Sequence, residues 1–256
     1  MKKVLYRIGI GLISVFAILI IVFLIWANDI YKADPEKLAM VLDNAASSVA
    51  VTEKADYWEI MPNGSGSLVS NNPQTGLIYY PGAKVDPKAY FYMLSGLSNG
   101  QAENMKVFIT KPPLNLALFS INQADKVIAD HPEIKKWIVG GHSMGGSMSC
   151  EYVKNRTDVI SELWLFAAYC ASDISTTPLN VLSIHGSLDG ILTPEKLSEN
   201  RKNLPLSAKD VVIKGMNHAQ FGNYGVQSGD QKAVKDDETV KMEIARILNS
   251  LNYTNE

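Results

Sequence analysis

Apolar residues follow two different patterns along this chain. Residues 8–27 form one apolar run without a charged side chain, whereas beyond residue 48 short apolar runs alternate with segments of helical periodicity. The first pattern is typical of a membrane-spanning helix, and the second is typical of an α/β domain with a mostly parallel sheet. The segment between them, residues 28–48, is interpreted as a juxtamembrane linker with a short helix that begins at Pro35.

Short runs rich in β-branched and aromatic residues predict the strands of the domain. They cover residues 49–52, 57–61, 77–80, 106–109, 137–139, 162–168, 181–185 and 211–214. Amphipathic patterns predict helices over residues 87–98, 116–130, 143–154, 194–203 and 231–249. The later strands alternate with helices, which requires right-handed crossovers, so we expect one α/β domain over residues 49–256.

The N-terminal run predicts where this domain is located. A helix over residues 8–27 would be about 30 Å long, which matches the hydrocarbon thickness of a bilayer. Lys2, Lys3 and Arg7 precede it, so the positive-inside rule places residues 1–7 in the cytoplasm and the α/β domain outside. A cleaved signal peptide, and hence secretion, is the alternative, but its apolar region is usually shorter and residues 26–29 form a poor cleavage site. We therefore predict a single-pass signal anchor in the cell membrane.

A Gly-x-Ser-x-Gly motif, Gly141 to Gly145, lies between a predicted strand and a predicted helix. This context is the one that a nucleophile elbow requires, because the chain turns so sharply at the serine that neighbouring side chains would clash. The motif therefore predicts that Ser143 is a nucleophile. A glycine-rich turn without chemistry is the alternative interpretation of the motif alone.

With this elbow, the chain resembles the α/β-hydrolase superfamily, and within it the small capless esterases of the dienelactone-hydrolase-like group (α/β-hydrolase fold family 5). The family order of serine, then acid, then histidine implies His218 as the base, because it follows the last predicted strand. The segment from His185 to Asp189 resembles the His-Gly-x-x-Asp segment of the family, which implies Asp189 as the acid. Asp173, after the preceding strand, is the alternative acid.

These three residue types fit one chemistry. A serine hydroxyl is a weak nucleophile until a base removes its proton, and a carboxylate on the other ring nitrogen orients that base. The resemblance further implies an oxyanion hole made by the backbone N–H of Met144 and by one N–H from the loop after the third strand. That second donor is Gly82, Ala83 or Lys84. We interpret His142 as a neighbour of the elbow and not as a second base.

The predicted activity follows from this site. Residues 169–180 are too few for an inserted cap domain, so we expect an open pocket that favours small or exposed acyl groups. The resulting prediction is a membrane-anchored, extracytoplasmic serine hydrolase that cleaves small carboxylic esters without a metal or an organic cofactor. A thioesterase, amidase, lactonase or acyltransferase with the same residues is the alternative, as is a non-catalytic binding protein with this fold.

Charge and cysteine content indicate whether the chain binds nucleic acid or zinc and whether it forms a disulfide. The formal net charge is −2 and no basic run is present, which argues against binding to nucleic acid. The chain has 2 cysteines, Cys150 and Cys170, without the spacing of a zinc site. An oxidising compartment would permit a bridge between them, but their positions in the predicted elements favour two buried free thiols. The oligomeric state is left open.

Overall fold

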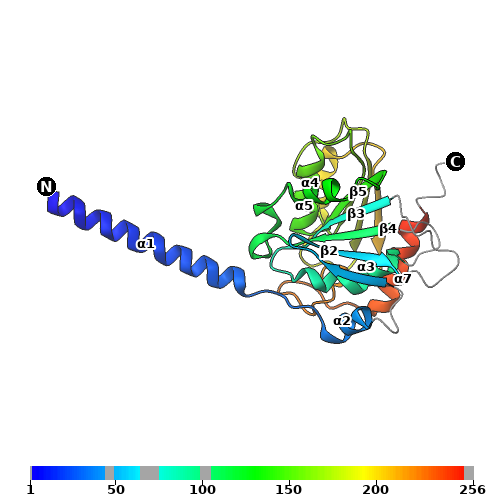
Figure 1. Cartoon of the computed structure of the whole chain (residues 1–256), viewed down its shortest axis with the longest axis horizontal. Coiled ribbons are helices and arrows are strands. Elements are labelled where there is room, and N and C mark those ends of the chain that lie inside the picture. Colours follow the sequence, from blue (N-terminus) through cyan, green and yellow to red (C-terminus); the bar gives the residue numbers. More distant parts are fainter. Residues whose placement is uncertain (1, 44–48, 64–74, 99–104, 251–256) are drawn as a thin grey trace. The chain divides into compact units, whose positions relative to one another are not determined.

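The computed structural model describes residues 2–43, 49–63, 75–98 and 105–250 (Figure 1). The chain divides into two compact units, residues 1–30 and residues 31–256, and each is considered by itself. The predicted linker lies across this division, because α2 (Pro35–Leu42) belongs to the second unit.

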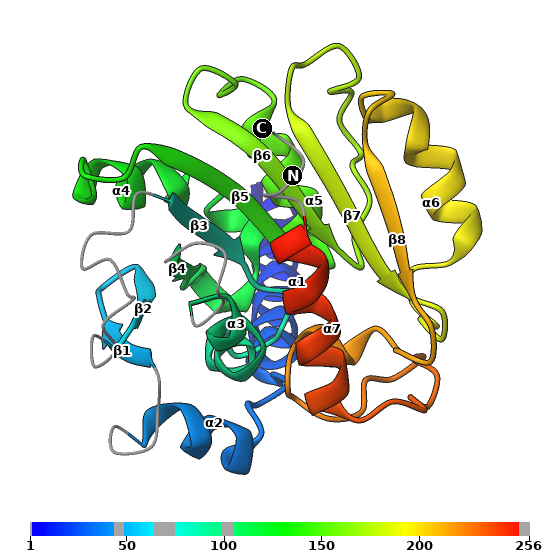
Figure 2. The ribbon, with the colours of Figure 1, turned by 90° about the vertical axis from the view of Figure 1, so that its right-hand side faces the viewer.

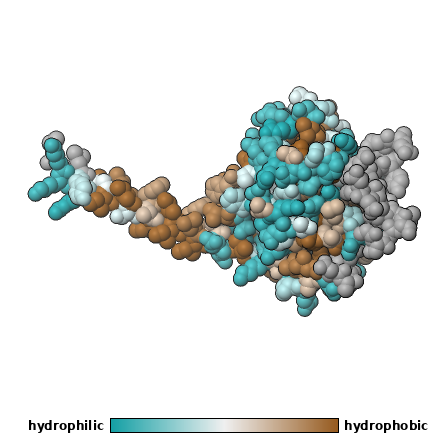
Figure 3. Space-filling view, in the orientation of Figure 1, coloured by the Kyte–Doolittle hydropathy of each residue, from teal (hydrophilic) through white to brown (hydrophobic). Residues whose placement is uncertain are grey.

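The first unit consists mainly of helix α1 (Lys2–Asn28). Its segment Tyr6–Asn28 contains an 18-residue window with a mean hydropathy of 3.2, so the segment is long and apolar enough to cross a membrane, although a signal sequence would have the same properties. Figure 3 shows apolar side chains along this helix and hydrophilic ones at its N-terminal end. The structure thus contains the predicted apolar helix.

The second unit is built around an eight-stranded sheet in the order β1-β2-β4-β3-β5-β6-β7-β8. The β1–β2 and β2–β4 pairs are antiparallel and all the other neighbouring pairs are parallel. The strands are β1 (Val49–Glu53), β2 (Tyr57–Pro62), β3 (Thr75–Tyr80), β4 (Met105–Thr110), β5 (Lys136–His142), β6 (Ile160–Phe166), β7 (Asn180–Gly186) and β8 (Lys209–Ile213). Each one overlaps a strand that the sequence predicts, so the mostly parallel α/β architecture is confirmed.

Helices connect these strands and cover both faces of the sheet (Figure 2). After α2 they are η1 (Pro87–Tyr90), α3 (Phe91–Ser98), η2 (Pro113–Asn115), η3 (Ala117–Phe119), α4 (Gln123–Asp130), α5 (Met144–Val153), α6 (Pro194–Asn200), η4 (Arg201–Asn203), η5 (Ala219–Phe221) and α7 (Asp237–Ser250). Between β6 and β7 the structure has only turns, so no cap domain is inserted there.

The alternation of side chains along β3 shows how the core is divided. Leu77 and Tyr79 pack in the cluster that contains the buried residues of α3 and α7, whereas Ile78 and Tyr80 pack in the cluster that contains those of α4 and α5. Successive side chains of a strand point to opposite faces, so a strand that is apolar at every position is buried on both sides. This explains the uninterrupted burial of β3.

Two predicted helices differ from the structure. The predicted helix 116–130 is broken, because Ser120 adopts the non-helical angles φ −149° and ψ 48° and its hydroxyl donates to Oε1 of Gln123. The predicted helix 231–249 begins only at Asp237, where the carboxylate of Asp236 accepts the N–H of Thr239 and so caps α7.

The prediction of two free thiols is wrong. Cys150 in α5 and Cys170 after β6 form a disulfide, and their Cα atoms lie 5.6 Å apart, within the usual range for such a bridge. Helix α5 packs against the segment that follows β6, where the Ser147 hydroxyl donates to the carbonyl of Tyr169 over 2.8 Å. This packing brings the two cysteines together, and neither residue spacing nor periodicity indicated it.

Candidate active site

Ser143 lies between the end of β5 and the start of α5. It has φ 54° and ψ −124°, a backbone conformation that is uncommon for a residue with a side chain. Its N–H donates to the carbonyl of Phe166 on the neighbouring strand over 3.0 Å. A serine held in such a conformation between a strand and a helix has the geometry of a nucleophile elbow.

Two glycines make this turn sterically feasible. A Cβ atom on Gly145 would overlap the carbonyl oxygens of Tyr80 and Pro81, and one on Gly141 would lie 2.6 Å from the carbonyl carbon of Gly145. Both close contacts involve backbone atoms, which cannot move aside as a flexible side chain can. The crowding that the sequence predicts at this motif is therefore present.

His218 and Asp189 form a buried pair on neighbouring loops. His218 lies on the base loop, residues 214–231, which follows β8, and Asp189 lies on the acid loop, residues 187–192, which follows β7. The Nδ1 atom of His218 is 2.8 Å from Oδ2 of Asp189, and both side chains are 1% exposed. The other carboxylate oxygen, Oδ1, accepts the N–H groups of Ile191 and Leu192. Asp189 is thus oriented by its own loop and in turn orients the imidazole.

The ring of His218 lies next to the elbow. The His218 ring lies against the ring of His142, the residue before Ser143, with a centroid distance of 4.5 Å. Within the described residues the buried Nε2 atom of His218 has no hydrogen-bond partner. Ser143 Oγ is therefore not yet bonded to it, and such bonds are often long before a substrate binds.

Asp173, the alternative acid, has different surroundings. Its side chain is exposed and Oδ1 accepts the N–H of Ser175 over 3.0 Å. Hydrogen bonds from the Ser175 side chain and from its N–H lower the pKa of Asp173. The structure pairs His218 with Asp189 and not with Asp173.

The loop of residues 81–86, which we call the oxyanion loop after its predicted role, follows β3 and lies beside the elbow. The Gly82 N–H donates to Tyr90 Oη over 2.9 Å, and the Lys84 N–H donates to the carbonyl of Asn115 over 2.8 Å. Among the hydrogen bonds of the described residues, none occupies the N–H of Ala83 or of Met144. Of the three residues suggested by the sequence, Ala83 is thus the one whose N–H has no partner.

A profile of the alpha/beta hydrolase family matches residues 76–242, which is more than half of the chain. The chain belongs to this family. No curated protein matches the sequence.

Solved structures show the same α/β-hydrolase fold. A thermostable esterase from Pseudomonas putida is 14% identical, with a TM-score of 0.58 over 82% of this chain and 84% of that chain. A predicted CIB-like hydrolase from Thermoplasma acidophilum is 12% identical, with a TM-score of 0.55 over 79% of this chain and 99% of that one. Dienelactone hydrolase from Anabaena variabilis is 12% identical, with a TM-score of 0.52 over 79% and 96% of the two chains. At such low identity these likenesses establish the fold alone.

In this α/β hydrolase, Tyr90 connects the oxyanion loop to the elbow. Burial lowers the pKa of His142 well below its usual value, and the adjacent His218 adds to the effect, so His142 is neutral. Tyr90 Oη accepts the Gly82 N–H and is hydrogen-bonded to His142 Nδ1 over 3.0 Å, so it joins the oxyanion loop to the residue before Ser143. The helical pattern over residues 87–98 predicts Tyr90 to be a core residue. Nothing in the sequence indicated the role of its hydroxyl.

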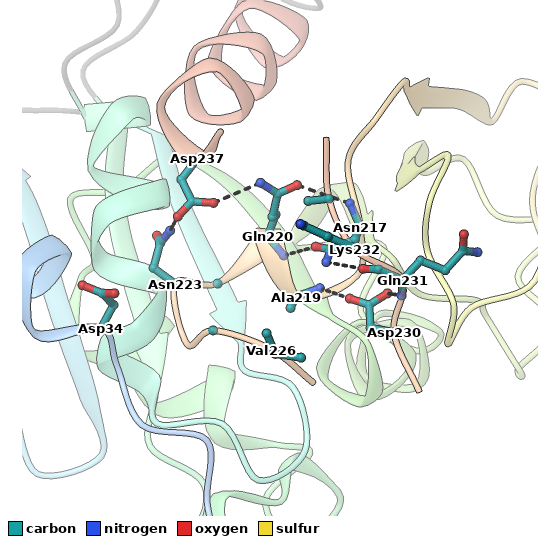
Figure 4. Close-up of a pocket in the computed structure, with 13 residues that line it drawn as sticks. Asp34, Asn217, Ala219, Gln220, Asn223, Val226, Asp230, Gln231, Lys232 and Asp237 are labelled. Atoms are coloured by element: carbon teal, nitrogen blue, oxygen red, sulfur yellow. Dashed lines mark hydrogen bonds between the residues drawn. The ribbon is translucent and has the colours of Figure 1, made fainter. Parts of the chain in front are cut away.

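Asp230 connects the acid loop to the base loop, and it too was not predicted. Its Oδ1 accepts the N–H of Gly190 over 3.0 Å, and its Oδ2 accepts the N–H of Ala219 over 2.9 Å. These donors directly follow Asp189 and His218 in the chain. Figure 4 shows the Asp230 carboxylate beside Ala219, at the border of a hollow of about 510 Å³. Asp230 belongs to the base loop, so its carboxylate ties this loop to itself at Ala219 and to the acid loop at Gly190.

Proposed function

We propose that this α/β hydrolase is a serine hydrolase that cleaves carboxylic esters, anchored in a membrane and acting outside the cytoplasm. The observation that carries the proposal is the buried pair of His218 and Asp189, whose imidazole lies against His142, the residue before a serine with positive φ. A serine, a histidine and a carboxylate in this order have the roles of nucleophile, base and orienting acid.

In the proposed reaction, Ser143 Oγ attacks the ester carbonyl carbon while His218 Nε2 takes the hydroxyl proton. Asp189 accepts the Nδ1–H of His218 and stabilises the imidazolium that forms. His218 then gives the proton to the leaving alkoxide, which departs as the alcohol and leaves an acyl group on Ser143. A water molecule, deprotonated by His218, attacks this acyl group and releases the acid.

The negative charge of each tetrahedral intermediate needs preorganised donors. We assign these roles to the N–H groups of Met144 and Ala83. Gly82 is a poorer candidate because its N–H already donates to Tyr90, and Lys84 is poorer because its N–H donates to Asn115.

The substrate class follows from the connection between β6 and β7. It contains no inserted domain that would cover the site, so long lipid chains would have no enclosed tunnel there. We therefore propose small or exposed acyl groups. Preference for long-chain over short-chain p-nitrophenyl esters would contradict this assignment, and a panel with thioesters, amides and lactones would identify the bond that is cleaved.

The proposed location rests on α1 and on the charges at its start. Lys2, Lys3 and Arg7 favour a cytoplasmic N-terminus. The bridge between Cys150 and Cys170 fits an oxidising compartment. We expect the intact N-terminal peptide in the membrane fraction and protease sensitivity of the α/β domain from the outer side. A mature form that starts near Asn28 would instead indicate a cleaved signal peptide.

The direct test of the chemistry is labelling of the full-length protein with a fluorophosphonate, which reacts only with an activated serine. We expect Ser143→Ala to abolish labelling and to lower kcat for p-nitrophenyl acetate by about 10⁴-fold or more. Ser147→Ala is the matched control, because it removes a hydroxyl one helical turn away that donates to Tyr169. Full esterase activity in Ser143→Ala, or an unlabelled natural protein, would refute the proposal.

A further inference from the structure

The second unit begins with an extended segment, residues 31–34, which we call the strap. Tyr31 forms a parallel bridge with Val85 of the oxyanion loop. The Tyr31 N–H donates to the carbonyl of Lys84 over 2.7 Å, and the Asp86 N–H donates to the carbonyl of Tyr31 over 2.9 Å. The strap therefore holds the oxyanion loop immediately after Ala83.

The strap also contacts the base loop. The Asp34 N–H donates to the carbonyl of Asn223 over 2.7 Å. The Tyr31 ring packs on the ring of Tyr224 with a centroid distance of 5.5 Å. Asn223 and Tyr224 are both buried and lie on the base loop shortly after His218, and Figure 4 shows Asp34 and Asn223 at the edge of the same hollow.

These contacts give the strap a geometric role. The candidate donor Ala83 and the candidate base His218 lie on loops that follow two different strands, β3 and β8, at opposite sides of the elbow strand β5 in the sheet order. The strap is bonded to both loops at once, so it fixes the distance between them. An error of about 1 Å in the placement of a catalytic group can lower a rate by about 100-fold.

We propose that the strap positions the oxyanion loop relative to His218, with Tyr31 and Asp34 as positioning residues; this inference rests on the proposed function. It assigns catalytic importance to a segment that the sequence pattern presents as part of a linker. Because the oxyanion donors act on the transition state and not on the bound ester, loss of the strap lowers kcat and leaves KM nearly unchanged.

The first test compares Tyr31→Ala with Tyr31→Phe in the full-length protein in detergent micelles. Alanine removes the ring that packs on Tyr224, whereas phenylalanine keeps it. We expect about a 10-fold lower kcat for Tyr31→Ala with KM within about twofold, and nearly full kcat for Tyr31→Phe. Leu248→Ala, in the buried face of α7, is the control for a general loss of stability.

The second test isolates one backbone hydrogen bond at Asp34. Its angles of φ −60° and ψ 122° suit proline, and its carboxylate caps α2 by accepting the N–H groups of Glu36 and Lys37. Asp34→Ala and Asp34→Pro both remove that cap, but only proline removes the N–H that donates to Asn223. We expect kcat to be about threefold to tenfold lower for Asp34→Pro than for Asp34→Ala. This pair decides the question if Tyr31→Ala does not fold.

The outcomes separate this inference from the proposed function. Failure of the natural protein to react with a fluorophosphonate refutes the proposed function, and the positioning role with it. A second outcome is that the natural protein is labelled while Asp34→Pro has the same kcat as Asp34→Ala and Tyr31→Ala has the same kcat as the natural protein. That result refutes the positioning role of the strap and leaves the proposed function intact. A matching loss of kcat in a Leu248→Ala variant of equal Tm also refutes it, because the effect would then reflect stability.

Discussion

The elbow and the oxyanion loop lie side by side at one edge of the sheet, but they are held in different ways. The elbow is shaped by its own sequence, since Gly141 and Gly145 allow the backbone to approach within distances that any Cβ would prevent. The oxyanion loop is held from outside, by the hydroxyl of Tyr90 and the carbonyls of Asn115 and Tyr31. Steric crowding at the elbow admits only glycine at fixed positions and so leaves a pattern in the sequence, whereas a backbone hydrogen bond can be made by almost any residue type and leaves none.

The largest effect is expected from a methyl group inside the elbow. Gly145→Ala would place a Cβ on the carbonyl oxygens of Tyr80 and Pro81, so the elbow and β3 must move apart. We expect a loss of about 3 kcal/mol in the free energy of unfolding, measured by urea denaturation, and no detectable fluorophosphonate labelling.

Gly96→Ala provides the control for this variant. A Cβ at position 96 would meet mainly the flexible side chain of Lys241, at 3.2 Å, and α3 gains helix propensity. Normal stability and labelling of Gly145→Ala would show that the elbow does not depend on this close backbone approach.

A smaller effect is expected where a single side chain joins two loops. Asp230→Ala leaves the N–H groups of Gly190 and Ala219 without their acceptor, so the acid loop and the base loop can separate. We expect kcat to fall by about 100-fold, with partial recovery in Asp230→Asn, whose amide oxygen can accept one of the two N–H groups. Equal kcat in both variants and the natural protein would show that the two loops hold their positions unaided.

The smallest effect is expected at the link between the oxyanion loop and the elbow. Tyr90→Phe keeps the ring but removes the oxygen that accepts the Gly82 N–H, so the loop loses one of its several attachments. We expect kcat to fall by about 10-fold, with KM within about twofold. A change in KM alone would indicate a contact with the bound substrate and not the positioning of the loop.

Much of the fold could be predicted from periodicity. The strands were predictable because burial on both faces requires apolar residues at successive positions, as in β3. The helix predicted over 116–130 was wrong in its middle, because hydrophobic periodicity does not indicate that the backbone leaves the helical conformation at Ser120.

The candidate site was predictable to a different degree at each residue. Ser143 was predictable because the crowded turn requires the glycines of its motif. Its positive φ agrees with such a turn. Asp189 and His218 were suggested by the family resemblance and lie in contact, and their catalytic roles remain predictions. Asp230 could not be found, because an aspartate in a loop has many ordinary uses and only the folded loops give it two donors.

The sequence by itself determined the apolar N-terminal helix, the alternation of strands and helices, and the position of the elbow. The first two depend on the periodicity of side chains close together in the chain, and the elbow admits only glycine at Gly141 and Gly145, so the residue pattern records all three. Only the tertiary structure decided that Cys150 meets Cys170, that Tyr90 supports Gly82, and that the strap joins two loops. A hydrogen bond or a disulfide forms only when both partners are placed within a few ångströms, and that placement depends on how the whole sheet brings its loops to one edge.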